Sequence, residues 1–554
     1  MTKKSWQWLF YTSWFLLLLI QASFIELMSD EAYYWSYSQR LDWGYLDHPP
    51  MIAVLIKLGS SLFGGELGVR IVPILLSVSS VYIWQMIIAP KNLKLFYGMV
   101  MSVGILHFLN FMAIPDAPFI FFASLFVLVF KKILATPDKL VNYLFIGLVT
   151  GGMLLSKYHA VLLIGFMVLA NVKLLLNYRF WIAVVVATFV LLPHILWQVS
   201  HDYLSLQFHL DERSFEPYHF GDTLEYIVTQ FFVLGPITGI LFFIALVKRQ
   251  AVDRFEWTLK FLFWGVIVFL LFMTFKGNVE AHWTFITIIP GLYFVYKYFE
   301  GKEKWVQGIQ RMGVSILILV IVIKGVLMVD LTRWFDMPLV YAEWQSNAAR
   351  SKQIADKVWG RPVGFMNSYQ KASLYEFYTG NPAFSLSNAI GRRDQYEVWK
   401  LEQQYLGDEV VIVANYYERN FDSIWFDKEL ISYKIAEDFQ YYSFLEAHLS
   451  DFKQVYKSGE LVNAKVEVLD FKTDGTRLDS DYPCELRYFI FKGEEYVSDE
   501  HFAFVSNEEI GKQINGKIRI PLETGSYRVQ VNVKSGWIPP IRSPDYRMFE
   551  VQYD

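Results

Sequence analysis

Three acidic residues lie in one short polar stretch that follows the first apolar segment of the chain, namely Asp30, Glu31 and Asp47. The apolar segment runs from about Trp6 to Leu27, and the polar loop after it is rich in Trp and Tyr. Carboxylates near a bilayer are costly unless they are solvated, paired or used. One of them could act as a general base, because a hydroxyl is a poor nucleophile until its proton is removed. The alternative is a solvated interfacial pair, Asp30 and Glu31, that only holds the loop.

The second candidate element is Asp47-His48, which two prolines follow. Consecutive prolines break any helix and fix the direction of the backbone. The loop would therefore present Asp47 and His48 rigidly at the mouth of a site. The alternative is a loop corner whose polar residues are incidental.

Asp116 and Lys157 are further candidates, each between two apolar segments. Asp116 is either functional, as isolated carboxylates at membrane depth usually are, or an N-cap of the next helix. Lys157, with Tyr158 beside it, interrupts an apolar stretch that is too long for one span. Since a lysine at the bilayer centre costs about 2.5–3.5 kcal/mol, we expect one span to end there. Lys157 would then suit a phosphate group as a point charge, or it merely snorkels to the interface.

Arg213 lies in one polar loop with three histidines, His201, His209 and His219. We expect this loop to line a polar cavity, with Arg213 as a candidate phosphate ligand.

His282 lies at another turn, two residues after Glu280. Glu31, His48 and His282 are candidate ligands of a divalent metal ion, but no metal-site spacing joins them. Histidine is also a common interface residue. The sequence requires no cofactor and leaves the metal requirement open.

Long apolar segments must position these residues. Of 554 residues, 54% are hydrophobic and 19% charged, against about 25% charged in soluble proteins. Windows of about 20 apolar residues predict about eleven membrane spans. They lie near 8–26, 67–89, 95–113, 117–135, 141–156, 160–176, 180–199, 223–247, 261–275, 282–299 and 312–330. A shorter amphipathic segment, from about residue 50 to Phe63, is expected as a helix at the interface.

The distribution of Lys and Arg predicts the orientation. Most of them fall in the loops that share a side with the N-terminus, so the N-terminus is expected to be cytoplasmic. With an odd number of spans, the chain after about residue 331 is then extracytoplasmic, and the candidate residues all map to the outer face. The net charge of −4 argues against nucleic acid as a partner. Cys484 is the single cysteine, so no intrachain disulfide can form.

The remaining chain has the composition of a soluble protein. The buried-type strand 410–413 predicts an α/β region, whereas strict alternation at 462–468 and 527–533 predicts strands of a β-sandwich. Asn515-Gly516 and 473–475 are predicted as turns between strands. We therefore expect a transmembrane domain at 1–335, an extracytoplasmic α/β domain at 336–452 and a sandwich at 453–554.

The outer-loop motifs, taken together, resemble the membrane-embedded GT-C glycosyltransferases. The similar branch holds the dolichyl-phosphate-mannose protein mannosyltransferases and the lipid A aminoarabinose transferase, and the likeness covers about residues 1–330. The motifs that carry it are Ser29-Asp30-Glu31-Ala32-Tyr33, Asp47-His48-Pro49-Pro50, Pro115-Asp116-Ala117 and Leu155-Ser156-Lys157-Tyr158.

The resemblance implies an inverting transfer of a sugar from a polyprenyl phosphate to a hydroxyl group of a protein, lipid or glycan. It implies that Asp30 is the general base, supported by Glu31, and that Asp116 binds the acceptor or orients the site. Lys157, Arg213 and His48 would hold the leaving phosphate, whose developing charge needs stabilisation. The chain has Asp47-His48 where the aminoarabinose branch has Glu-Lys. The implied setting is a bacterial inner membrane, with membrane lipids as further partners.

Two other classes of protein remain to be weighed. A transporter or lipid flippase would place ionisable groups at mid-membrane, often in repeated halves. The break at Gly235-Pro236 favours it, but the ionisable groups lie at one face and no repeat is evident. A membrane receptor would explain the C-terminal sandwich but not the acidic residues.

Overall fold

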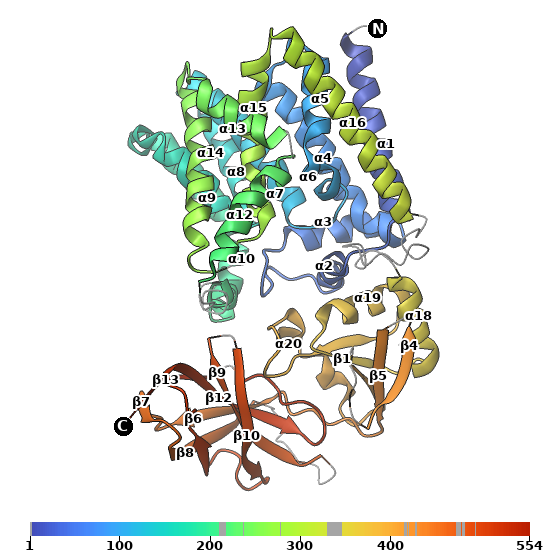
Figure 1. The fold of residues 1–554 in the computed structure, drawn as a ribbon, viewed down its shortest axis with the longest axis vertical. Coiled ribbons are helices and arrows are strands. Elements are labelled where there is room, and N and C mark those ends of the chain that lie inside the picture. The colour runs from blue at the N-terminus through green and yellow to red at the C-terminus, as the bar shows by residue number, and fades with distance from the viewer. Residues whose placement is uncertain are drawn as a thin grey trace. The chain divides into compact units, whose positions relative to one another are not determined.

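The computed structural model has two compact units, Met1–Ser346 and Asn347–Asp554, and each is considered by itself (Figure 1). The structure describes residues 3–209, 218–235, 238–277, 279–328, 346–414, 418, 420–426, 429–471, 478, 482–493, 495–543 and 545–553.

The described residues of the first unit form helices and the loops between them. Its α-helices are α1 (Lys3–Phe24), α2 (Ser29–Gln39), α3 (Met51–Ser60), α4 (Gly65–Ile88), α5 (Leu93–Ser102), α6 (Gly104–Leu109), α7 (Asp116–Ala135), α8 (Leu140–Leu154), α9 (Ala160–Leu169), α10 (Tyr178–Ser200), α11 (Leu204–Gln207), α12 (Phe220–Val233), α13 (Thr238–Lys248), α14 (Arg254–Met273), α15 (Ile288–Phe299) and α16 (Glu303–Met328). Two 3₁₀ segments are η1 (Val172–Leu176) and η3 (Ala281–Thr287).

Five of these helices, α4, α7, α10, α14 and α16, are long and apolar enough to cross a membrane. The pair α1 and α2, bent by 86°, raises the number to six if it forms one span. The other segments expected as spans contain shorter or interrupted helices. Residues 95–113 divide into α5 and α6 at Val103, and residues 223–247 divide into α12 and α13 near Gly235. Gly235 has a φ of 97°, which a residue with a side chain rarely adopts.

The prediction of a polar loop after the first span is wrong for residues 29–39, because these residues form helix α2. Glu31 explains why a helix starts there. As the third residue of the helix, it accepts a hydrogen bond from the backbone N–H of Met28 at 3.1 Å. Acidic residues in a first turn also interact favourably with the helix dipole. The amphipathic segment that follows is helical as expected, and forms α3.

The second unit begins with a mixed sheet in the order β2-β1-β3-β5-β4. Its strands are β1 (Val363–Met366), β2 (Ala383–Leu386), β3 (Val410–Ala414), β4 (Asp422–Phe426) and β5 (Glu429–Ala436). Strands β1, β2 and β3 are parallel, whereas β5 is antiparallel to both β3 and β4. Helices α18 (Asn347–Val358), α19 (Tyr369–Thr379) and α20 (Gln395–Trp399) accompany the sheet. Every residue of β3 is buried, which confirms the strand expected at 410–413.

The rest of this unit is β-rich, with sheet orders β10-β9-β12-β13-β7 and β11-β8-β6. The strands are β6 (Leu445–Ser450), β7 (Val455–Lys457), β8 (Leu461–Asp470), β9 (Cys484–Lys492), β10 (Glu495–Val505), β11 (Gln513–Arg519), β12 (Gly525–Ser535) and β13 (Arg547–Gln552). The alternation at 462–468 is confirmed by the burial of every second residue of β8.

Two details of these strands differ from expectation. In β12 the polar residues Gln530 and Asn532 are buried as well, because other segments cover their face and bond to them. The turn predicted at Asn515-Gly516 is wrong, because both residues pair with β8 inside β11. A Cβ atom on Gly516 would lie 2.6 Å from the ring of Phe502, so glycine serves close packing there rather than a turn.

Candidate active site

Glu31 belongs to a buried ion pair in the first unit. The Arg70 guanidinium donates to both of its carboxylate oxygens at 2.8 and 2.6 Å, and both side chains are 0% exposed. The backbone N–H of Ala113 donates to the same carboxylate at 2.8 Å, while Arg70 also donates to the carbonyl oxygens of Ile25 and Glu26. Glu31 therefore joins α2, α4 and the segment that leads to Asp116.

Asp30 lies on a different face of α2 from Glu31. Residues four and seven positions apart share a helix face, so Asp30 is aligned with Tyr34 and Tyr37. The Tyr37 hydroxyl donates to Asp47 Oδ1 at 2.5 Å, and the Tyr34 ring lies edge-on to His48 at 5.4 Å. Asp30 is partly exposed and is therefore the acid of the pair that solvent or a ligand can reach.

Asp116 and Lys157 form the second buried ion pair. The Lys157 ammonium donates to both carboxylate oxygens at 2.8 Å, and each side chain is 5% exposed. His282 Nε2 lies 3.9 Å from Asp116 Oδ2. Pro115, not Asp116, is the N-cap residue of α7, and Lys157 is paired rather than snorkelling. The two residues, 41 positions apart, thus make one charged site near the starts of α7 and α9.

His48 lies between these groups. It is within electrostatic reach of Asp47, Lys157, His209 and Asp116. Burial lowers the pKa of His48 to about 3, partly opposed by Asp47, so its imidazole is neutral at pH 7. A backbone hydrogen bond of 3.1 Å from Met51 to Leu155 ties the loop of His48 to the link that carries Lys157.

Tyr158 is held by two residues of α10. Its hydroxyl lies 3.2 Å from His194 Nε2 and accepts a hydrogen bond of 3.0 Å from Gln198. His194 Nδ1 lies 2.7 Å from the carbonyl oxygen of Trp43, which can only accept. Nδ1 must therefore carry the proton, so that Nε2 accepts from Tyr158. This chain of bonds fixes the residue next to Lys157 against the loop that leads to Asp47.

The structure thus gathers most of the residues expected from the sequence. Arg213 lies outside the described residues, and His282 joins the site through Asp116. Among the residues that the structure describes, no group of three acidic, His or Cys side chains could hold a metal ion.

Sequence reasoning assigned no role to Arg70, Tyr37 or His194. The spacing of Asp30, Tyr34 and Tyr37 would have shown their common face if residues 29–39 had been treated as a helix. The partner of Glu31 had no such local signal, since it lies 39 positions along the chain.

Comparisons with known proteins show what part of the chain and its fold are similar to. Residues 47–197 match the family model described as dolichyl-phosphate-mannose-protein mannosyltransferase. The lipid A galacturonosyltransferase RgtD of Rhizobium johnstonii (strain DSM 114642 / LMG 32736 / 3841) is 27% identical over 290 residues, which cover 48% of this chain and 59% of that protein. The alignment therefore spans less than two thirds of that relative.

The fold is similar to that of ArnT from Cupriavidus metallidurans. The apo structure of ArnT gives a TM-score of 0.58 at 14% identity and covers 78% of this chain and 98% of that chain. The structure of the same protein bound to undecaprenyl phosphate gives 0.57 at 14% identity, with the same coverage.

The chain therefore has a fold similar to that of ArnT, with several candidate membrane spans and a β-rich C-terminal region. Residues 47–197, which include the motifs around Asp47, Asp116 and Lys157, are thus similar to the family of the dolichyl-phosphate-mannose protein mannosyltransferases, in agreement with the resemblance found from the sequence.

Proposed function

We propose that the protein transfers a sugar from a polyprenyl-phosphate-linked donor to a hydroxyl group of a lipid, glycan or protein, with inversion at the sugar. The observation that carries this proposal is the buried pair of Asp116 and Lys157 beside His48, with the accessible Asp30 on the adjoining face of α2. The name of the relative RgtD and the undecaprenyl phosphate in the ArnT structure support it.

Asp30 is the proposed general base. In the transfer step the acceptor oxygen forms a bond to C1 of the sugar, and its proton passes to the carboxylate of Asp30. The bond from C1 to the phosphate oxygen breaks at the same time. Its electron pair stays on that oxygen, so polyprenyl phosphate leaves with additional negative charge.

Lys157 is the proposed counter-charge for the leaving phosphate. In the ground state Asp116 neutralises it, so the site holds a positive charge without leaving it unpaired in a buried place. As negative charge develops on the phosphate, the ammonium can share its donors between Asp116 and the leaving group. Neutral His48 adds a polar contact without a further charge. Arg213 stays a proposed phosphate ligand, and His282 and Tyr158 complete the proposed binding surface.

Glu31 has a different proposed role from Asp30. Arg70 and a backbone N–H bond to its two oxygens, so it is a positioning residue rather than a second base. Asp47, which accepts from Tyr37, is proposed to position the loop of His48.

The number of spans, their orientation, the domain boundaries and the acceptor are also proposals. We infer eleven spans, of which the shorter and broken helices supply those beyond the five long ones. The N-terminus would be cytoplasmic, and the tail would be extracytoplasmic in a bacterial inner membrane. The tail would comprise an α/β domain at 336–452 and a sandwich at 453–554. A lipid A type glycolipid is the first acceptor to test, because RgtD is named for that acceptor.

The test uses the purified full-length protein in nanodiscs with polyprenyl-phosphate donors carrying a hexose, a hexuronic acid or an aminopentose. Mass spectrometry measures the release of polyprenyl phosphate and the product. Asp30→Asn is expected to lower kcat by about 10²-fold or more, the usual contribution of a general base, with little change in KM. Asp138→Asn is the matched control, because Asp138 is 88% exposed and pairs only weakly with Arg179.

Full transfer by Asp30→Asn would exclude Asp30 as the base. If no donor releases polyprenyl phosphate in the wild type, while labelled lipid still crosses the bilayer, the protein is a flippase instead.

A further inference from the structure

His159 lies two residues after Lys157, in the turn that leads into α9, and the proposed transfer gives it no role. The turn is tight, because the backbone N–H of Ala160 donates to the carbonyl oxygen of Lys157 at 3.1 Å. His159 is the N-cap residue of α9, but its side chain makes no capping hydrogen bond. Capping of the helix therefore does not account for the imidazole.

The imidazole of His159 lies beside the ion pair of Asp116 and Lys157. It is within electrostatic reach of both residues and of His282. The start of η3 supports this placement, because the ring of Trp283 packs on the ring of His159 with centroids 4.8 Å apart. The neighbouring His282 lies 3.9 Å from Asp116. Two adjacent residues of η3 thus contact His159 and Asp116, which places these two side chains at one turn.

The ring nitrogens of His159 form no hydrogen bond with any residue that the structure describes. Two sheltered histidines of the same unit do have such partners. His107 Nε2 lies 2.7 Å from the carbonyl oxygen of Met101, and His194 Nδ1 lies 2.7 Å from that of Trp43. Polar groups in sheltered places are normally paired in this way. Because His159 is partly exposed, a ligand can reach its imidazole and supply the partner.

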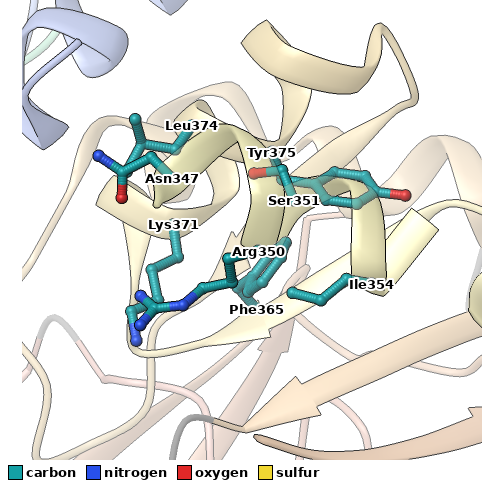
Figure 2. A pocket seen from close by; sticks show the side chains of 8 residues that line it. All are labelled: Asn347, Arg350, Ser351, Ile354, Phe365, Lys371, Leu374 and Tyr375. Atoms are coloured by element: carbon teal, nitrogen blue, oxygen red, sulfur yellow. The ribbon is translucent and has the colours of Figure 1, made fainter. Parts of the chain in front are cut away.

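The pocket between α18 and α19 in the second unit offers a contrast (Figure 2). Arg350 and Lys371 line it, and both contact Glu429, with Lys371 Nζ 3.0 Å from Oε1 and Arg350 donating to Oε2. Ion pairs within the protein account for these basic side chains, so a ligand is not needed to explain them. His159 differs, because no described residue accounts for its ring nitrogens.

A phosphate group beside Lys157 needs more donors than Lys157 alone can give. An ammonium group carries three N–H donors, and Lys157 bonds to both carboxylate oxygens of Asp116 at 2.8 Å. A neutral imidazole adds an N–H donor without bringing a second cation into a buried place. Burial lowers the pKa of His159 well below its ordinary value of 6.5, and Lys157 lowers it further, partly opposed by Asp116, so the ring is neutral at pH 7.

We propose that the His159 imidazole donates a hydrogen bond to the phosphate of the polyprenyl-linked donor beside Lys157, and that the ring of Trp283 holds the imidazole in place for this bond. The inference rests on the proposed sugar transfer, since it concerns the same phosphate. A neutral N–H can bond to this phosphate both before and after the sugar leaves. His159 therefore contributes to the binding of donor and product alike, and its loss should appear in Kd and KM more than in kcat.

The test measures binding of undecaprenyl phosphate, with undecaprenol as the probe that lacks the phosphate. The full-length protein in phosphatidylcholine nanodiscs is titrated with either lipid, and native mass spectrometry gives the bound fraction. His159→Phe keeps a ring that can pack on Trp283 but has no N–H. It should weaken binding of undecaprenyl phosphate about tenfold or more, because a hydrogen bond to a charged group is lost, and leave binding of undecaprenol unchanged. The KM for the donor should rise by a similar factor.

Two amide variants separate the hydrogen bond from the ring contact. His159→Asn and His159→Gln place an N–H near the position of Nδ1 or Nε2 but have no ring. At least one of them is expected to bind undecaprenyl phosphate more tightly than His159→Phe. If His159 served only to pack against Trp283, the order would be reversed, with His159→Phe nearest to the wild type.

His501→Phe is the matched control. His501 belongs to β10 of the second unit, is 47% exposed and pairs with Glu485 at 3.1 Å, so its loss should leave lipid binding unchanged. Wild-type affinity of His159→Phe for undecaprenyl phosphate overturns the role of His159 and leaves the proposed transfer standing. Binding by both amide variants that is no tighter than binding by His159→Phe does the same. A wild-type protein that does not prefer undecaprenyl phosphate to undecaprenol contradicts the proposed transfer, and the role of His159 with it.

Discussion

Replacing Glu31 by Gln tests the separation of roles within the acidic pair. The substitution keeps the shape of the side chain and an oxygen that can accept from Ala113, but it removes the charge that Arg70 faces. Arg70 is 0% exposed and would be left as an uncompensated buried cation. Breaking one partner of a buried pair costs about 3–5 kcal/mol, and we expect a loss of stability of that order.

The assay compares the fraction of protein that stays monodisperse after heating with the transfer rate of the protein that remains folded. We expect Glu31→Gln to unfold at a lower temperature and to retain measurable turnover, whereas Asp30→Asn keeps the wild-type unfolding temperature. The double variant Glu31→Gln with Arg70→Met should regain part of the stability, because the buried charge is gone. Wild-type stability of Glu31→Gln combined with abolished turnover would refute the positioning role.

Three further changes have defined outcomes. Lys157→Met should lower kcat strongly and Lys157→Arg less so, because Arg keeps the charge; equal activity of both variants in the phosphate-release assay would contradict the counter-charge role. Tyr37→Phe removes the hydrogen bond to Asp47 and should cost ~1.5–3 kcal/mol in stability or in transition-state binding, measured as unfolding temperature and kcat/KM. Burial raises the pKa of Glu402 to about 7, above the ordinary value of 4.5, so the folded state binds more protons than the unfolded state between these pH values. Stability should therefore fall as pH rises from about 4.5 to 7, by up to ~3 kcal/mol from this group, and Glu402→Gln should flatten the dependence of unfolding temperature on pH.

Local patterns in the sequence predicted those structural features that depend on residues close together in the chain. The apolar segments became helices, and the alternation in β8 identified its buried face, because burial on one side of a strand imposes a period of two. The turn prediction at Asn515-Gly516 was wrong because Gly516 is needed for its close packing against the ring of Phe502, a contact that exists only in the folded sheet.

The site residues were predictable as types but not as pairs. Asp30 and Glu31 were adjacent acids in the sequence, whereas about 100° of helix rotation sends them to different faces. The partner of Asp116 and the partner of Glu31 lie 41 and 39 positions away, so the helix packing that brings them together decides the roles. Lys157 was expected at a phosphate, and its contact with Asp116 adds the reason why it can stay charged while buried.

The contact between Arg70 and Glu31 also bears on how the chain enters the membrane. An unpaired arginine raises the cost of inserting a span, by about 2.5–3.5 kcal/mol at the centre and by less near an end, where Arg70 lies in α4. Glu31 precedes Arg70 in the chain, so the neutralising partner is already made when α4 leaves the ribosome. The third contact, from Ala113, can form only after α5 and α6 have been made. The contacts that hold Glu31 are therefore completed in steps during synthesis, and a chain that stops before residue 113 would lack the contact from Ala113.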